Sequence, residues 1–343
     1  MFPGEPHPVL VADRAQAWAR GREVVTAAVP REQFRHLALL YHGSGEYLSA
    51  LRTFVQACVA RGDAVFVAVP KRKAKLVRQE LGADSAHMTL ADMTELGRNP
   101  ARIIPAVLSY ASRHRGQDVC FIGEPIWPGR TAAEVQEATR HEALINLAFR
   151  DSPVTTVCQY DGVRLPKSVL ADAARTHPAV IRDRQEIASV SYLGPPHLPP
   201  RCTRALSPLP AHAEALSYRD DLYPVRSFVT SRAERAGLAE LRISDLVMAV
   251  NELAGNTLRH TGGGGTVHFW RTSDRIICQV CDTGQITDPL ARHRVPPDED
   301  LGGKGLWLVN QLCDLVQART GGAGTVTRLH MRTASARRPQ ARP

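Results

Sequence analysis

The stretch "DLVMAVNELAGNTLRHTGGGG", residues 245–265, decides the fold of the second half of this 343-residue chain. Its apolar residues recur at every third or fourth position, which is the spacing of a helix with one broad buried face. Ser244 precedes the run and is expected to cap its N-terminus, and the glycines from Gly262 onward are expected to end it. The stretch therefore predicts a long helix that stops in a glycine-rich loop.

Glu252 and Asn256 are four residues apart on this helix, so their side chains are expected to be neighbours. An amide oxygen such as that of Asn256 is a ligand that Mg²⁺ accepts beside waters and phosphate oxygens. A carboxylate next to that metal can take a proton from an attacking hydroxyl group. An exposed polar pair on a helix surface has the same spacing, so the pair needs further motifs to indicate a catalytic site.

Two segments in which apolar and polar residues alternate come next, Thr266–Arg271 and Arg275–Cys281, and they predict an antiparallel hairpin. Asp282 and Gly284 stand at the end of its second strand. A carboxylate there can accept a hydrogen bond from an exocyclic amine such as that of adenine, and a glycine lets a ring approach the backbone. Asp-x-Gly is also a common turn, so this motif gains meaning only beside the others.

A polar segment with three prolines, Gln285–Asp300, comes next and is expected to be a mobile lid. It leads into "LGGKGLWLVN", residues 301–310, where glycines stand directly before an apolar run with helical spacing. The free amides and the dipole of a helix N-terminus favour phosphate, which makes Gly303 and Gly305 candidate phosphate contacts. Lys304 between them can place a compact positive charge against the same phosphates.

The order of these motifs over about residues 218–331 resembles that of the GHKL ATPase superfamily. The motifs are Glu-x-x-x-Asn, Asp-x-Gly, the lid, Gly-x-Gly before a helix and the closing strand "GAGTVTRLHM". Within it, "LYPVRSFVTSRAERAGL" followed by "AVNELAGNTLRHTGGG" is most similar to the anti-sigma-factor serine kinases. The resemblance implies an α+β sandwich with helices on one face of a mixed sheet, and ATP and Mg²⁺ as cofactors. It implies these roles: Glu252 as catalytic base, Asn256 as Mg²⁺ ligand, Asp282 and Gly284 at adenine, Gly303, Lys304 and Gly305 at the phosphates, and Thr325 near the adenine floor.

The first half of the chain alternates continuous apolar runs with longer amphipathic ones. This pattern predicts an α/β domain around a mostly parallel sheet. Its first strand-to-helix turn, "YHGSGEYL", lacks the Gly-Lys-Ser/Thr of a P-loop, so a P-loop ATPase is not predicted.

Five segments of this half resemble the MEDS sensory domain, a RecA-like fold without its nucleotide loop, over about residues 36–181. They are "HLALLYHGSGEYLSAL", "FIGEP", "RHEALINLAF", "VCQYDGVRL" and "ARTHPAVI". The resemblance implies that the domain senses a small molecule or a protein partner. Its candidate contact residues are His42, Glu124, Glu142, Asn146, Tyr160, Asp161 and His177, although a buried polar side chain that satisfies backbone groups has the same sequence pattern.

The domain boundary is expected in the connector 193–217, which holds six prolines and has no sustained periodicity. The predicted parts are therefore a sensory domain over 1–192, the connector, an ATPase domain over 218–332 and a disordered basic tail over 333–343.

Overall composition excludes several classes of protein. The net charge is +9, yet only five of the 43 basic residues are lysines and the arginines form no dense block, so direct nucleic-acid binding is not predicted. No apolar run approaches the ~18 residues of a membrane span, and the N-terminus has no apolar signal segment, so a cytoplasmic location is expected. Seven scattered cysteines indicate reduced thiols. Cys278 and Cys281 would face opposite sides of a strand, so they do not predict a metal pair.

These observations favour a cytoplasmic anti-sigma regulatory factor under the control of a sensory domain. It would bind Mg-ATP, sequester a sigma factor and phosphorylate a serine or threonine of an anti-anti-sigma antagonist of the STAS type. The presence of Glu252 favours a kinase, because a pure binding scaffold needs no base at that position. Related kinases bind their partners as dimers, so the resemblance is compatible with a homodimer.

Two other interpretations stay open at this point. One is a sensor histidine kinase, because "RHEALINL" places His141 before Glu142 on a predicted helix and superficially resembles a phospho-acceptor box. No two-helix dimerisation hairpin precedes the ATPase part, however. The other is an ATP-dependent binding switch that transfers no phosphate. In the sequence, only the presence of Glu252 favours the kinase over this switch.

Overall fold

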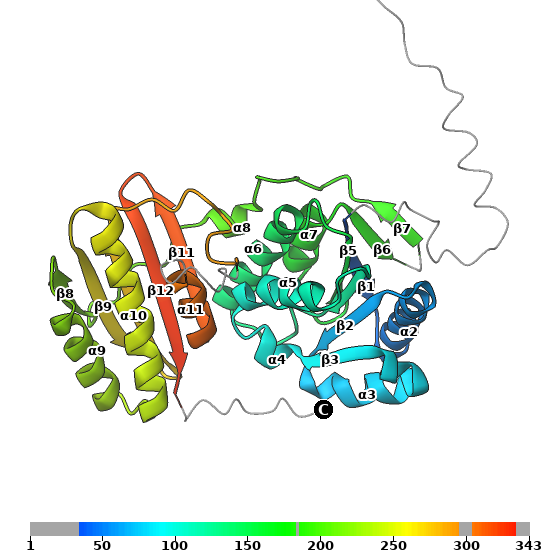
Figure 1. Ribbon diagram of the computed structural model, residues 1–343, viewed down its shortest axis with the longest axis horizontal. Helices are drawn as coiled ribbons and strands as arrows, with labels where there is room; N and C mark the ends of the chain where they lie inside the picture. The colour runs from blue at the N-terminus through cyan, green and yellow to red at the C-terminus, as the bar shows by residue number, and fades with distance from the viewer. Residues whose placement is uncertain (1–33, 183–184, 295–303, 334–343) are drawn as a thin grey trace, which may run out of the picture.

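The computed structural model describes residues 34–182, 185–294 and 304–333 of the chain. These residues form two β-sheets with their helices, and Figure 1 shows the two halves of the molecule side by side. Within these ranges, no helix combines the length and the apolar character that crossing a bilayer requires.

The first domain is built on a seven-stranded sheet with the order β3-β2-β4-β5-β1-β6-β7. Its strands are β1 (Arg35–Tyr41), β2 (Ala64–Val69), β3 (Met88–Asp92), β4 (Val119–Gly123), β5 (Val154–Asp161), β6 (Ala179–Arg182) and β7 (Gln185–Ala188). All neighbours are parallel except β6 and β7, which pair antiparallel. The predicted α/β domain with a mostly parallel sheet is confirmed.

Helices cover both faces of this sheet because its central strands are apolar on both faces. On one face, α2 (Ser44–Arg61) and α3 (Lys71–Leu81) pack with Leu37 and Leu39 of β1. The alternate residues Ala38 and Leu40 face the other layer. That layer contains α5 (Ile103–Arg113), α6 (Ala132–Ala148) and α7 (Lys167–Thr176). The short helical elements are η2 (Gly82–His87), α4 (Met93–Leu96), η3 (Pro100–Arg102) and α8 (Pro200–Thr203).

The second domain is built on a five-stranded sheet with the order β11-β12-β10-β9-β8. Its strands are β8 (Glu214–Tyr218), β9 (Gly265–Arg271), β10 (Arg275–Asp282), β11 (Leu315–Gly321) and β12 (Gly324–Arg332). Every neighbouring pair is antiparallel, so the expectation of a mixed sheet was wrong. The reason is that two helices, α9 (Tyr223–Arg235) and α10 (Glu240–Thr261), join β8 to β9. A helix pair brings the chain back to the end of the sheet where β8 stopped, so β9 runs in the opposite direction.

The long helix predicted from residues 245–265 is α10, and its apolar face packs on the second sheet. It begins at Glu240 with Ala239 as its N-cap, so the cap predicted at Ser244 was wrong. The hydroxyl of Ser244 donates instead to the Glu240 carbonyl oxygen one turn back. The additional first turn is held by Arg242, which pairs with two aspartates. The predicted end at Gly262 is confirmed, with a left-handed φ of 62°.

The face of the second sheet that α9 and α10 leave open packs against the first domain, chiefly against α6 (Figure 1). Glu134 of α6 binds Arg275 of β10 and Arg332 of β12, both at 2.8 Å. Glu137, one turn further along, binds Arg319 of β11 at 2.8 Å. The two domains are therefore joined by ion pairs in which Glu134, Glu137, Arg275 and Arg319 are largely removed from water, whereas the Arg332 side chain is 43% exposed.

Candidate functional site

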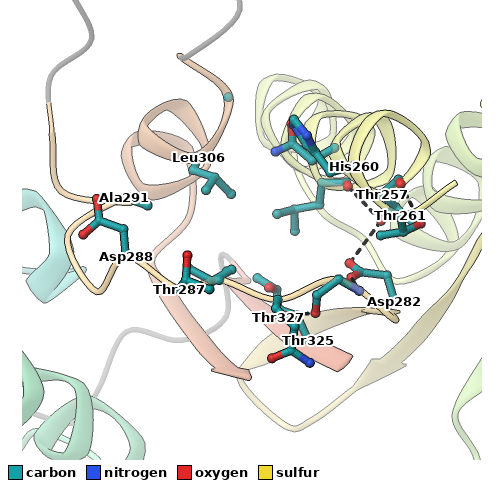
Figure 2. Close-up of a pocket in the computed structure, with 16 residues that line it drawn as sticks. Thr257, His260, Thr261, Asp282, Thr287, Asp288, Ala291, Leu306, Thr325 and Thr327 are labelled. Carbon is teal, nitrogen blue, oxygen red and sulfur yellow. Dashed lines mark hydrogen bonds between the residues drawn. The ribbon is translucent and has the colours of Figure 1, made fainter. Parts of the chain in front are cut away.

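A cavity of about 400 Å³ lies in the second domain beside α10. Its walls come from α10, the end of β10, the segment that follows β10, the first turn of α11 (Gly305–Leu312) and β12 (Figure 2). The side chains and backbone that line it belong to Leu253, Asn256, Thr257, His260, Thr261, Asp282, Gly284, Gln285, Ile286, Thr287, Asp288, Ala291, Gly305, Leu306, Thr325 and Thr327. Five of the eight site residues predicted from the sequence are among them: Asn256, Asp282, Gly284, Gly305 and Thr325.

The other three predicted residues are Glu252, Lys304 and Gly303. Glu252 lies one helical turn before Asn256 on α10, at the edge of the cavity. Lys304 is the N-cap residue of α11, whose first turn lines the cavity. Gly303 lies outside the described residues.

Asp282 is held in one orientation by its neighbours. Its Oδ1 accepts a hydrogen bond from the backbone N–H of Gly284 at 2.7 Å. Its Oδ2 lies 3.1 Å from the hydroxyl of Thr257 (Figure 2). That hydroxyl in turn accepts a hydrogen bond from the Tyr218 hydroxyl at 3.0 Å. A carboxylate fixed in this way presents its acceptor oxygens to the cavity without rearrangement, as recognition of an amine donor requires.

Gly284 and Thr325 form the wall next to Asp282. A Cβ at Gly284 would lie 2.8 Å from Asp282 Oδ1 and 3.0 Å from the Thr261 methyl carbon, so only glycine fits there without a shift. The hydroxyl of Thr325 donates to the Gly284 carbonyl oxygen at 2.8 Å and lies 2.9 Å from the hydroxyl of Thr320. The turn after β10 is thus fastened to β12 below the cavity.

Glu252 and Asn256 meet the first turn of α11. A Cβ added at Gly305 would lie 2.7 Å from Glu252 Oε2 and 3.6 Å from Asn256 Nδ2, so the absence of a side chain lets the helix start approach both residues. The amide oxygen of Asn256, the predicted Mg²⁺ ligand, accepts a hydrogen bond from Arg259 Nη2 at 2.6 Å. Arg259 is exposed, so this contact can open at little cost.

The first half of the expected lid is partly exposed, and its buried residues are Leu290, Arg292 and His293. Residues 285–288 line the cavity, and Leu290 is buried among the apolar side chains of the first domain. The carbonyl oxygen of Arg292 accepts a hydrogen bond from Asn310 Nδ2 of α11 at 2.9 Å. Residues 295–300, the remainder of the expected lid, lie outside the described ranges.

Sequence reasoning missed Thr257, Arg259 and Tyr218. Thr257 follows Asn256 directly, and the helical period places it on the buried side of α10. A threonine at such a position is ordinarily interpreted as a core residue and not as part of a site. Arg259 and Tyr218 reach the site through their side chains from an exposed position and from β8, and no local spacing marks such contacts.

The candidate residues of the first domain separate into groups. Glu124 binds Lys73 Nζ at 2.7 Å and the Tyr41 hydroxyl at 3.2 Å. Asp161 accepts backbone N–H groups of its own turn, and His42 is half exposed beside Glu46. The others lie together: Glu142, Asn146, Tyr160 and His177.

The residues of the second-domain cavity fit an adenine nucleotide with Mg²⁺. A volume of about 400 Å³ is within the range of ligand pockets, roughly 300–1,000 Å³. Asp282 supplies a fixed acceptor at one end, and Asn256 supplies a hard oxygen donor at the other, beside a helix N-terminus. Asn256 and Lys304 would hold the metal and phosphate groups, and Asp282 the base.

Family models match both halves of the chain. Residues 35–178 match the MEDS model, described as the methanogen/methylotroph, DcmR sensory domain, and residues 217–331 match the histidine kinase-like ATPase domain. No curated protein matches.

Similar solved structures are remote. The RsbU and RsbW domains of Rv1364c from Mycobacterium tuberculosis are 17% identical, with a TM-score of 0.28 over 60% of this chain and 49% of that one, so the match spans about half the length of that chain. A second solved structure, an isolated ATPase domain, is 14% identical, with a TM-score of 0.32 over 55% of this chain and 90% of that one. A DnaB-like replicative helicase is 13% identical, with a TM-score of 0.31 over 52% and 58%. On the two family matches, the chain joins an N-terminal MEDS domain to a C-terminal histidine kinase-like ATPase domain.

Proposed function

We propose that this chain is an anti-sigma regulatory kinase. Its ATPase domain binds Mg-ATP, sequesters a sigma factor and phosphorylates a serine or threonine of an anti-anti-sigma antagonist protein, and its MEDS domain controls this activity. The observation that carries the proposal is the position of the Glu252 carboxylate, beside Asn256 and against the first turn of α11 at the edge of the cavity. The sequence resemblance of residues 218–331 to anti-sigma-factor serine kinases supplies the acceptor class.

Each residue of the site has a defined task in such a transfer. Asp282 orients the nucleotide by accepting a hydrogen bond from the base, and the start of α11 receives the phosphates. Bound Mg²⁺ neutralises charge on the phosphate oxygens. Glu252 accepts the proton of the attacking serine or threonine hydroxyl. The amide oxygen of Asn256 has two lone pairs, and the one that accepts from Arg259 would become available to a metal ion when that contact opens.

The contact between the first domain and α11 supports control by the MEDS domain. Asn99, the N-cap residue of η3, donates from Nδ2 to both the backbone and the side-chain oxygen of Asn310, at 3.0 and 3.1 Å. Arg98 binds Asp314 at 3.1 Å and donates to the Gln311 carbonyl oxygen at 3.2 Å. The helix whose first turn lines the nucleotide cavity is thus held at its other end by the first domain. A shift of η3 would therefore be transmitted to the phosphate end of the site.

The structure argues against His141 as a phosphate acceptor. His141 is 2% exposed on α6, and burial lowers the pKa of its imidazole to about 4. The space next to it is a cavity of about 10 Å³ shared with Arg292 and His293, enough for one water molecule and too small for a phosphoryl group. This location favours an acceptor on a separate protein.

The test uses proteins that the full chain captures from its native host with and without Mg-ATP. Captured proteins are incubated with the chain and γ-labelled ATP, and the label is located by acid stability and mass spectrometry. The proposal predicts acid-stable label on a serine or threonine, reduced about 10²- to 10⁴-fold by Glu252→Ala. Glu240→Ala, on the first turn of the same helix, is the matched control and should retain transfer.

Nucleotide binding without any transfer in the presence of captured partners would reduce the chain to a binding switch. Acid-labile label on His141 would establish the histidine kinase instead. Transfer that survives Glu252→Ala would remove the proposed base.

A further inference from the structure

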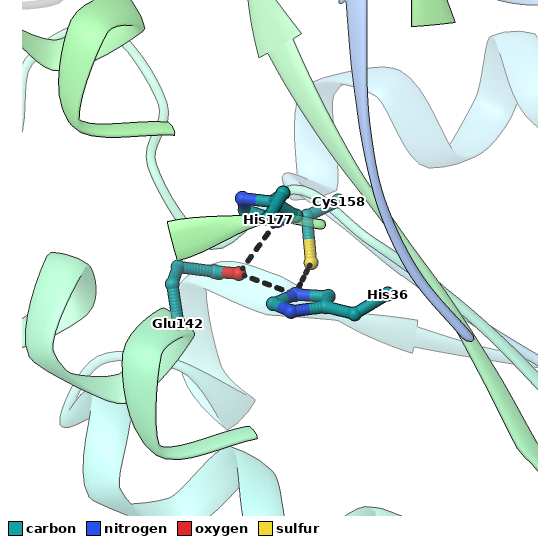
Figure 3. A group of neighbouring side chains, drawn as sticks. All are labelled: His36, Glu142, Cys158 and His177. Carbon is teal, nitrogen blue, oxygen red and sulfur yellow. Dashed lines mark hydrogen bonds and ion pairs between the residues drawn. The ribbon is translucent and has the colours of Figure 1, made fainter. Parts of the chain in front are cut away.

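Four side chains from separate segments of the MEDS domain converge at one buried point (Figure 3). They are His36 of β1, Glu142 of α6, Cys158 of β5 and His177, which follows α7. One nitrogen, oxygen or sulfur atom from each lies within 4.8 Å of all the others. The side chains of His36, Glu142 and His177 are at most 1% exposed, and Cys158 is fully buried.

Three of the six separations between these atoms match a tetrahedral metal site, and the other three are at most 4.8 Å. Glu142 Oε2 lies 3.1 Å from His36 Nε2 and 3.1 Å from His177 Nε2. Cys158 Sγ lies 3.5 Å from His36 Nε2. In a tetrahedron with zinc bond lengths, nitrogen and oxygen ligands are about 3.3 Å apart and nitrogen and sulfur about 3.6 Å. The observed separations agree with these values to within a few tenths of an ångström.

The hydrogen bonds behind the cluster fix both imidazole tautomers. Asn146 donates from Nδ2 to the Thr176 carbonyl oxygen at 2.7 Å, so its Oδ1 is the atom that faces His36 Nδ1 at 3.1 Å. His36 Nδ1 must therefore carry the proton. His177 Nδ1 lies 2.8 Å from the Ala173 carbonyl oxygen, which can only accept, so this nitrogen carries the proton as well. In the neutral form of each ring the remaining lone pair is on Nε2, and both Nε2 atoms face the cluster.

With both imidazoles neutral and no ion bound, buried lone pairs would face one another at this point. Two Nε2 atoms and the Glu142 carboxylate are all acceptors, and the Cys158 thiol has a single proton to donate. Among the described residues, Glu142 Oε1 has no hydrogen-bond partner, and the polar atom that faces His177 Nε2 is Glu142 Oε2, itself an acceptor. Buried acceptors left in this state are costly and rare.

We propose that His36, Glu142, Cys158 and His177 bind one divalent transition-metal ion of the zinc type. The ion takes the four facing lone pairs, and the Cys158 thiol loses its proton to solvent when the metal binds. A carboxylate and a thiolate then balance the two positive charges of the ion in an interior that water does not reach. Imidazole and thiolate ligands exclude Mg²⁺ and Ca²⁺, which prefer oxygen, and a mixed nitrogen, oxygen and sulfur set suits Zn²⁺.

The site has the character of a closed structural centre. Four protein ligands complete a tetrahedron and leave no position for a substrate. The ion ties β1, β5, α6 and the segment after α7 together across one face of the sheet, and Asn146 and the Ala173 carbonyl orient the two imidazoles as supporting partners. Glu142, Asn146 and His177 were candidates from the sequence, whereas His36 and Cys158 were not.

The first test measures metal content in the full chain, produced in zinc-supplemented medium. After removal of loose metal, the protein is unfolded in guanidinium with a chromogenic zinc chelator. One equivalent of zinc is expected per wild-type chain, and Cys158→Ser should lose most of it. Cys120→Ser is the matched control, because Cys120 is buried in the adjacent strand β4 outside the cluster, and it should retain one equivalent.

A second measurement stands without any variant in a ligand residue. Wild-type chain produced with Co²⁺ in place of zinc should show a thiolate-to-cobalt charge-transfer band and the intense visible bands of tetrahedral cobalt. Asn146→Ala, which keeps all four ligands, should weaken metal binding about 10- to 100-fold. A folded wild-type chain with neither bound zinc nor a cobalt–thiolate band would overturn the proposal, as would a folded Cys158→Ser variant with full metal content.

Discussion

Gly305→Ala tests the geometry of the candidate catalytic site most selectively. The new methyl carbon would lie 2.7 Å from Glu252 Oε2, where ordinary contact begins at 3.4 Å, so the carboxylate must move by about 0.7 Å. A carboxylate at the end of a flexible side chain can move this far at little cost in folding free energy. Misplacing a catalytic group by about 1 Å can reduce the rate of reaction about 10²-fold. We therefore expect phosphoryl transfer to fall about 10- to 100-fold while the variant stays folded.

The assay compares label transfer to the captured antagonist with nucleotide affinity measured by calorimetry. Gly322→Ala is the matched control, because an added Cβ there meets nothing within 4 Å, and it should behave as wild type. Loss of transfer with retained Mg-ATP binding in Gly305→Ala is the expected pattern. A folded Gly305→Ala variant that transfers phosphate at the wild-type rate would refute the placement of the Glu252 carboxylate as the base.

Three further predictions concern binding and stability. Asp282→Asn should weaken ATP binding by about 1–3 kcal/mol, measured by calorimetry, because an amide nitrogen replaces one of the acceptors at the base. Arg259→Ala should strengthen Mg-ATP binding by up to about five-fold, because it frees the Asn256 oxygen from an exposed contact of at most about 1 kcal/mol. Burial alone would raise the pKa of Glu134, but the Thr131 backbone N–H, Arg275 of the second domain and Arg130 of the first outweigh it and lower the pKa to about 2. Since the folded pKa is below the usual 4.5, the stabilisation is complete above that pH and is lost as the pH falls from 4.5 towards 2. Denaturation curves of wild type and Glu134→Gln should differ by about 3 kcal/mol at neutral pH and by about half of that near pH 3; a difference that does not shrink in acid would contradict this origin.

Local patterns predicted much of the second domain. The period of α10, its glycine end, the hairpin of β9 and β10 and the strand β12 are all properties of short stretches, and the structure confirms them. The antiparallel order of the sheet was not predicted, because it depends on how the pair α9 and α10 returns the chain. The cap at Ser244 was misplaced because Arg242 stabilises one further turn through Asp314, which is 72 residues away.

Contacts between segments that are distant in the sequence could not be predicted either, because they also depend on how the whole chain folds. His36 meets Glu142 across 106 residues and Cys158 across 122, and no spacing rule joins them. The one readable signal was a histidine inside the otherwise apolar run "HLALLY". The packing of Leu290 into the first domain could not be predicted from the sequence, because the segment around it is polar and rich in proline.

Calorimetric titration of the purified full chain with ATP is the most direct test of the central claim that the cavity beside α10 holds a magnesium nucleotide. We expect one ATP per chain, binding that weakens when Mg²⁺ is removed, and loss of this Mg²⁺ dependence in Asn256→Ala. No uptake of ATP by the folded wild-type chain in magnesium buffer would contradict it.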